Sequence, residues 1–183
     1  MPENGVNMDD TKFNALLREQ IGHEFTASQQ YIAIAVYFDN EDLPQLAKHF
    51  YQQANEERNH ALMIVQYFLD RSKHVDIPGV APVRNDFVSA LDALELALAQ
   101  EKEVTDQIVK LASSARDESD YVGEQFMQWF LKEQVEEVAT MDTLVTVAKR
   151  AGSNLFDLET FVDREMGASG GDSTAPRAAG GAI

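Results

Sequence analysis

The sequence contains no cysteine, which excludes disulfides, thiolate-bound zinc and iron–sulfur clusters. Proline and glycine are scarce, with 5 and 10 residues, and there is 1 tryptophan. No apolar run reaches the roughly 18 residues that a membrane-spanning helix needs. The polar, acidic start MPENGVNMDD lacks the basic and apolar regions of a secretory signal. We therefore expect a cytoplasmic protein that does not span a membrane.

Basic side chains are also few. The 183 residues include 15 Lys and Arg against 31 Asp and Glu, which gives a formal net charge of -16. Such a surface repels nucleic acid and anionic membranes and attracts cations, so we expect neither nucleic acid nor a membrane as a partner. The same acidity would also serve solubility alone. Only the positions of the acids can decide between these readings.

Four long segments almost free of glycine and proline predict an all-α protein. The expected helices cover about 10–38, 43–71, 88–116 and 120–150, with a short fifth helix at 154–166. Asp42 is predicted to cap the second helix, and Ser119 or Asp120 the fourth. The folded domain is therefore placed at 10–166. Residues 1–9 are expected to be a flexible segment, and the low-complexity residues 167–183 a mobile tail.

The connection between the second and third helices, about residues 72–87, is much longer than the other two. Fully extended, it reaches on the order of 50 Å. A helix of this size is about 42 Å long. The connection can therefore run the whole length of the bundle and leave these two helices parallel. The sequence predicts a four-helix bundle with one long crossover and a short fifth helix.

Each long helix carries an apolar stripe that a glutamate interrupts near its middle. The interrupting residues are Glu24, Glu57, Glu101 and Glu137. An isolated ionised carboxylate in a dry core costs several kcal/mol, so buried acids are paired, protonated or bound to metal. No lysine or arginine stands at these stripe centres. Four carboxylates facing one another therefore indicate bound cations.

The second helix strengthens this interpretation. Glu57 and His60 form an E-x-x-H pair, whose three-residue spacing puts both side chains on one helix face. Carboxylate-rich ligation with a single imidazole suits iron or manganese. Zinc would bind as well, without the advantage of its usual nitrogen and sulfur ligands. We predict a pair of metal ions, with iron as the favoured element.

The sequence over about residues 10–166 resembles a bacterial, haem-free ferritin. The resemblance is carried by Glu24 with Tyr31 one heptad later, the E-E-x-x-H motif of 56–60, Glu101, and the run QFMQWFLKEQVEE at 125–137. It implies a ferritin-like bundle and a ferroxidase that oxidises Fe(II) with dioxygen. It also implies a homo-oligomeric cage of 24 chains that stores ferric mineral.

The resemblance also implies a role for each matching position. Glu24, Glu57 and His60 would bind the first iron, and Glu57 would bridge to a second iron held by Glu101 and Glu137. Other implied residues surround this pair. A third, looser iron site is matched by Glu56, Glu133 and Glu136. Gln134 would hydrogen-bond near the second iron. Electrons would be supplied or relayed by Tyr31 and Trp129.

Two departures from related families predict that no haem is bound. Arg58 follows Glu57, where haem-binding bacterioferritins carry the haem-ligating methionine. The last long helix has no second E-x-x-H motif, because Thr140 stands three residues after Glu137. The remaining histidines, His23, His49 and His74, are interpreted as surface or interface residues rather than ligands.

Two other functions stay open at this point. A di-metal oxidase or peroxidase would share the ligands without storing iron. A structural or partner-binding bundle whose site has decayed would keep the fold and lose stoichiometric Fe(II) binding.

Overall fold

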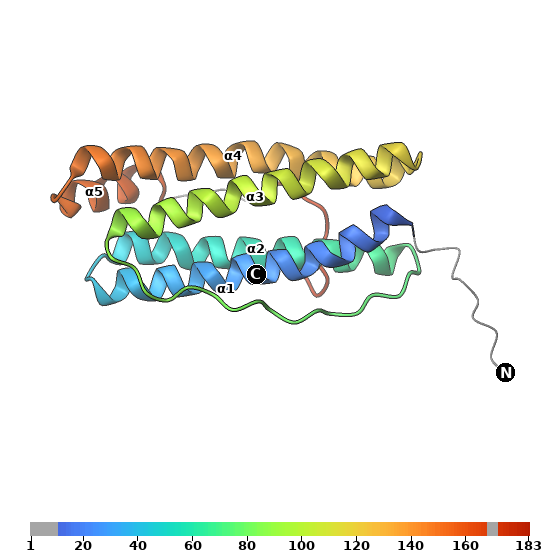
Figure 1. Cartoon of the computed structure of the whole chain (residues 1–183), viewed down its shortest axis with the longest axis horizontal. Helices are drawn as coiled ribbons and strands as arrows, with labels where there is room; N and C mark the ends of the chain where they lie inside the picture. Colours follow the sequence, from blue (N-terminus) through green and yellow to red (C-terminus); the bar gives the residue numbers. More distant parts are fainter. Residues whose placement is uncertain (1–10, 168–171) are drawn as a thin grey trace.

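The computed structural model describes residues 11–167 and 172–183, and this part of the chain contains helices but no strands. The four long helices form a bundle, and the short fifth helix lies at one end (Figure 1). Their bounds are Lys12–Asn40 (α1), Pro44–Asp70 (α2), Ala90–Asp117 (α3), Tyr121–Ala151 (α4) and Leu155–Glu165 (α5). The all-α fold class is confirmed. No described helix is both long and apolar enough to cross a membrane.

The helices pack as two antiparallel hairpins, α1 with α2 and α3 with α4 (Figure 1). The connection from α2 to α3 runs back along the length of the bundle, beside α1. Because it returns the chain to the end where α2 began, α2 and α3 point the same way. The predicted crossover is therefore confirmed.

The crossover is attached to α1 by hydrogen bonds. The side-chain amide of Gln30 donates to the carbonyl of Arg84 and accepts from its N–H, both at 2.8 Å. The N–H of Ala81 donates to the Thr26 hydroxyl at 3.2 Å. Gly22 lies against Pro78, where an added Cβ would meet the proline Cγ at 3.2 Å. These contacts explain how a segment without secondary structure keeps a fixed path.

Side-chain caps begin three of the long helices. Thr11, Ser89 and Asp120 accept hydrogen bonds from the first-turn N–H groups of α1, α3 and α4. The predicted Asp42 cap of α2 is wrong. Asp42 occupies the preceding turn at φ 57, and Leu43 is the N-cap residue without a side-chain hydrogen bond.

A distant carboxylate replaces the local cap of α2. Glu159 on α5 accepts the N–H groups of Gln45 and Leu46 at 2.9 and 2.8 Å. These N–H groups have no partner within the helix, and a negative charge at a helix N-terminus is favourable. The cap therefore also fixes α5 against the bundle.

The core consists of two apolar clusters with a polar layer between them. One cluster, which includes Phe38 and Phe50, lies toward α5, and the other includes Phe13 and Phe68. The polar layer contains buried side chains from all four long helices. These are Gln20, Glu24, Glu57, His60, Glu101, Gln134 and Glu137.

The C-terminal residues 172–183 lie against α2. The side chain of Asn59 accepts the N–H of Ile183 and donates to its carbonyl, both at 3.2 Å, and the N–H of Ala179 donates to the Leu62 carbonyl at 3.0 Å. These contacts differ from the mobile tail expected over 167–183. The flexible segment expected at 1–9 and residues 168–171 of the tail lie outside the described residues.

Candidate metal centre

Each long helix passes from one apolar cluster to the other at its central glutamate. The residues that flank each glutamate in the two clusters are Ile21 and Tyr31 on α1, Ala54 and Ala61 on α2, Ala97 and Val104 on α3, and Phe130 and Met141 on α4. The four carboxyls therefore occupy the same level of the bundle. Their residues are between 0% and 5% exposed.

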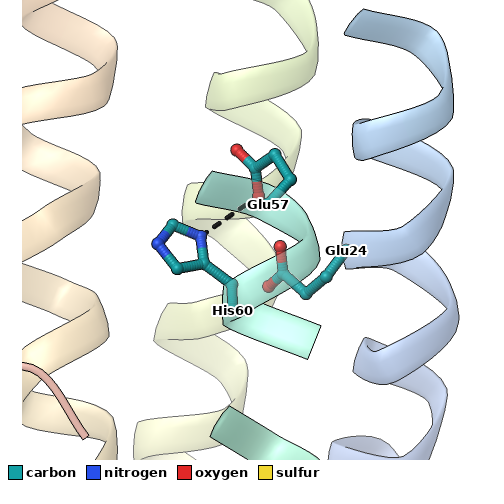
Figure 2. A group of neighbouring side chains, drawn as sticks. All are labelled: Glu24, Glu57 and His60. Atoms are coloured by element: carbon teal, nitrogen blue, oxygen red, sulfur yellow. Dashed lines mark hydrogen bonds and ion pairs between the residues drawn. The ribbon is translucent and has the colours of Figure 1, made fainter. Parts of the chain in front are cut away.

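Glu24, Glu57 and His60 form the tightest group in this layer. Each offers a ligand atom, and these atoms lie within 4.8 Å of one another. His60 Nδ1 is 3.1 Å from Glu57 Oε2, and Glu24 extends toward the pair from α1 (Figure 2). Among the described residues, no N–H group reaches Glu24 Oε2, although this oxygen is buried. The geometry suits a metal ion bound by two carboxylates and one imidazole.

The Glu101 carboxyl is held by two neighbouring side chains. The hydroxyl of Tyr31 donates to Glu101 Oε1, and Gln134 Nε2 donates to Glu101 Oε2 at 3.2 Å. Gln134 also contacts the Thr105 hydroxyl at 3.4 Å. Tyr31 is completely buried, and Gln134 is buried as well. Both predicted residues therefore act on the same carboxyl, which they orient from α1 and α4.

Glu137 is buried at the level of the other carboxyls, but neither it nor Glu101 belongs to the group within 4.8 Å. Burial raises the pKa of Glu137, and the charges of neighbouring carboxylates, Glu57 and Glu101 first among them, raise it further. The structure thus gathers the predicted first-iron residues closely. It places the predicted second-iron residues in the same buried layer, outside that group.

Burial is the main electrostatic influence on this layer. It raises the pKa of Glu24, Glu57 and Glu137 well above the ordinary carboxyl range, and neighbouring carboxylates raise it further. Burial also raises the pKa of Glu101 to about 7. Without a cation these groups favour the protonated form. A divalent ion supplies the positive charge that lets them ionise, so protons and metal compete for the centre.

Three further predicted residues lie at the edge of the centre. Glu56, Glu133 and Glu136 line a pocket of about 710 Å³ between α2 and α4, together with His60 and Glu137. Glu56 and Glu133 are partly buried, and Glu136 is exposed. The pocket gives the buried ligands an acidic connection to solvent. It is where the resemblance places a looser third ion.

Two buried residues beside the centre, His49 and Gln20, differ from what the sequence predicted. The three histidines were predicted to be surface or interface residues rather than ligands. His49 is only 8% exposed and lines the same pocket, so it does not lie on the surface of the chain, whereas His23 and His74 are exposed. Gln20 is buried and donates to Glu24 Oε1 at 2.9 Å and to Gln107 at 3.1 Å. Gln20 interrupts the apolar stripe one turn before Glu24, and this interruption was the available signal.

The C-terminal segment reaches the edge of the same pocket. Asp172 accepts a hydrogen bond from the indole N–H of Trp129 at 3.1 Å and lies 3.4 Å from Lys132 Nζ. The Trp129 ring stands edge-on to His60, with 5.5 Å between centroids. Asp172, Ala175 and Ala182 all line the pocket. The tail thus partly covers the indole beside the candidate ligand His60.

Deletion of residues 172–183 should uncover Trp129. Because it is the chain's 1 tryptophan, its fluorescence reports this site alone. We expect the emission maximum to move to longer wavelength and acrylamide quenching to increase. Asp172→Ala, which removes only the hydrogen bond, should give a smaller change of the same sign. Spectra identical to the wild type would show that the tail does not cover the indole in solution.

Most of the chain matches a known protein family. Residues 14–151 match the family described as the ferritin-like domain. The chain belongs to the ferritin family. The matched span contains all four long helices except the first two residues of α1, and with them every candidate ligand.

Several relatives extend this family match over nearly the whole chain. Ferritin BfrB of Mycolicibacterium smegmatis is 71% identical over 174 residues, which cover 95% of this chain and 96% of the relative. A Mycobacterium tuberculosis protein, named ferritin BfrB in one strain and bacterioferritin BfrB in another, is 65% identical over 94% of this chain and 96% of its own length. The bacterial non-heme ferritin of Staphylococcus aureus is 38% identical over 83% and 91%.

Solved structures agree on the ferritin fold. The open pore ferritin of the hyperthermophilic archaeon Archaeoglobus fulgidus matches with a TM-score of 0.82 and 28% sequence identity. The match covers 88% of this chain and 99% of the archaeal one. The predicted ferritin-like architecture is therefore confirmed.

Proposed function

We propose that this ferritin oxidises Fe(II) with dioxygen at the buried carboxylate layer and stores the ferric product as mineral inside a protein cage. The single observation that carries the proposal is the meeting of Glu24, Glu57, His60, Glu101 and Glu137 at one level between two apolar clusters. Ligands of this kind suit iron, because carboxylates and one imidazole bind hard and borderline ions.

The first substrate Fe(II) would bind Glu24, Glu57 and His60, the group whose ligand atoms lie within 4.8 Å. The second would bind between Glu57, Glu101 and Glu137, with Glu57 shared by both ions. Each Fe(II) gives one electron and dioxygen takes both. The carboxylates hold the two ions at bridging distance and favour the more highly charged product.

The surrounding residues have supporting roles in this proposal. Gln20 and Gln134 orient Glu24 and Glu101 through their hydrogen bonds. Tyr31 holds Glu101 and is the candidate for relaying electrons. Burial and the Glu101 carboxylate raise the pKa of Tyr31 well above its usual value, so its hydroxyl keeps the proton.

Iron leaving the centre has an acidic route. Glu56, Glu133 and Glu136 line the adjacent pocket and would take a third, weaker iron on its way to the mineral. We place the di-iron domain at residues 10–166, with the N-terminal segment and the C-terminal tail outside it.

The haem-free subtype is part of the proposal. Arg58, which follows Glu57 where a haem-ligating methionine would stand, is exposed and charged. A charged side chain at that position offers no thioether to a haem iron. In this proposal Fe(II) is the substrate, and the protein oxidises it without haem.

Assembly of 24 chains into a hollow shell completes the function. Phe156 on α5 is 84% exposed, and Val135 on α4 is 71% exposed. Exposed apolar side chains of this size favour burial against other subunits. The net charge of -16 would draw Fe(II) toward such a shell and disfavour nucleic acid and membranes as partners. We place the assembly in the cytoplasm.

Native mass spectrometry, electron microscopy and iron analysis of one loaded sample test the proposal. We expect a closed particle with an electron-dense core and many iron atoms per chain after aerobic Fe(II) addition. A particle that oxidises Fe(II) but never acquires a core would instead identify a di-metal oxidase. A bundle that binds no stoichiometric Fe(II) would favour the structural or partner-binding function.

A further inference from the structure

A second group of metal-binding atoms lies in the pocket, away from the central carboxylate layer. His49 and Gln53 are 8% and 7% exposed, and both line the pocket. Among the described residues, neither His49 Nε2 nor Gln53 Oε1 has a hydrogen-bond partner, although both atoms are buried. A buried polar atom without a partner costs free energy, so two such atoms on residues that line one pocket call for a ligand.

The two side chains share one face of α2 with the centre. His49, Gln53, Glu56 and His60 follow one another at spacings of four, three and four residues, which align them along the helix. The Gln53 amide donates to the Glu56 carboxylate through Nε2, which leaves Oε1 as the unpartnered atom. A row of nitrogen and oxygen ligands therefore runs from His60 toward the α5 end of the bundle.

The carboxylates that line the pocket favour the binding of a cation. Glu133, Glu136 and Glu165 line it together with Glu56, whereas Lys132 is the only lysine or arginine among its described lining residues. Burial lowers the pKa of His49 to about 4, so its imidazole is neutral at physiological pH and has a free lone pair. A neutral imidazole next to amide and carboxylate oxygens suits a divalent transition-metal ion better than magnesium or calcium.

We propose that His49 Nε2 and Gln53 Oε1 form a further binding site for a divalent transition-metal ion, distinct from the three iron positions above and completed by the Glu56 carboxylate. The site extends the proposed function, since it would hold an ion in transit between the central carboxylates and the pocket. Metal binding at this site does not, however, require that iron be oxidised. A metal that does not turn over can therefore test it.

Anaerobic crystals of the full chain soaked in Co(II) give the direct test, because anomalous scattering locates the metal. We expect a peak about 2.1 Å from His49 Nε2, in addition to the peak at the central group. In His49→Leu the pocket peak should disappear and the central peak should remain. Gln53→Leu should weaken the pocket peak, and the exposed His74→Leu should change neither.

Calorimetric titration of the same proteins with Co(II) provides the solution measurement. His49→Leu should lose one class of site, while His60→Ala should lose a central site and keep the pocket site. A water molecule in place of Co(II) at His49, or unchanged stoichiometry in His49→Leu, would overturn this inference and leave the proposed function standing. Binding at His49 without binding at Glu24, Glu57 and His60 would instead defeat the proposed function.

Discussion

Glu57→Ala and His60→Ala should each slow aerobic Fe(II) oxidation by at least about 100-fold, because each removes a ligand rather than a supporting contact. Glu57 is expected to have the larger effect, since it would serve both iron ions. Stopped-flow absorbance after addition of two Fe(II) per chain measures the rate. Circular dichroism should show unchanged helix content, because the helices are held together by the two apolar clusters rather than by these two side chains.

The control for this experiment is His74→Ala. His74 is exposed in the crossover and pairs with Asp76 there, so its loss should leave the rate unchanged. Glu136→Ala, at the pocket, should change the first turnover little and slow later ones. Wild-type rates in both Glu57→Ala and His60→Ala would refute the assignment of the centre.

Glu101→Gln should stabilise the metal-free protein at alkaline pH while abolishing rapid iron oxidation. Folding raises the pKa of Glu101 from its ordinary value of 4.5 to about 7. In this interval the unfolded chain has already lost the proton that the folded chain retains. The wild-type free energy of unfolding therefore falls as the pH rises from about 4.5 to about 7, by on the order of 3 kcal/mol.

The side chain of Glu101→Gln cannot ionise, so the free energy of unfolding of this variant does not fall in this way as the pH rises. Denaturant unfolding of chelator-treated protein should show a higher free energy of unfolding for Glu101→Gln at pH 8. At pH 5 most of the difference should vanish. Glu103→Gln, an exposed substitution on the same helix, should change the free energy by less than about 0.5 kcal/mol at either pH. A variant less stable than the wild type at pH 8 would show that the ionised carboxyl is stabilising without metal.

Helix positions and the crossover could be predicted because they follow from local chemistry. Glycine and proline mark the helix ends, and a three- to four-residue apolar period defines each buried face. The cap of α2 could not be predicted in this way. Asp42 had the right chemistry in the right place, but Glu159 satisfies the same N–H groups from α5, more than a hundred residues away.

In the candidate centre, too, the local sequence pattern predicted some residues, and tertiary contacts were needed to identify others. Interrupted stripes indicated Glu24, Glu57, Glu101 and Glu137, because a carboxylate in an apolar face needs an explanation. The interruption at Gln20 was equally visible, yet an amide costs less to bury and raised no expectation. Its role became clear only from its hydrogen bond to Glu24.

The sequence by itself determined the bundle, its crossover and the carboxylates in its core, because periodicity and residue chemistry are local properties of the chain. Only the tertiary structure decided that His49 is buried, that residues 172–183 lie against α2, and that three ligand groups stand within 4.8 Å. Burial and distance depend on which surfaces of separate helices meet. A histidine near a helix N-terminus or a tail rich in small residues carries no local sign of what will cover it.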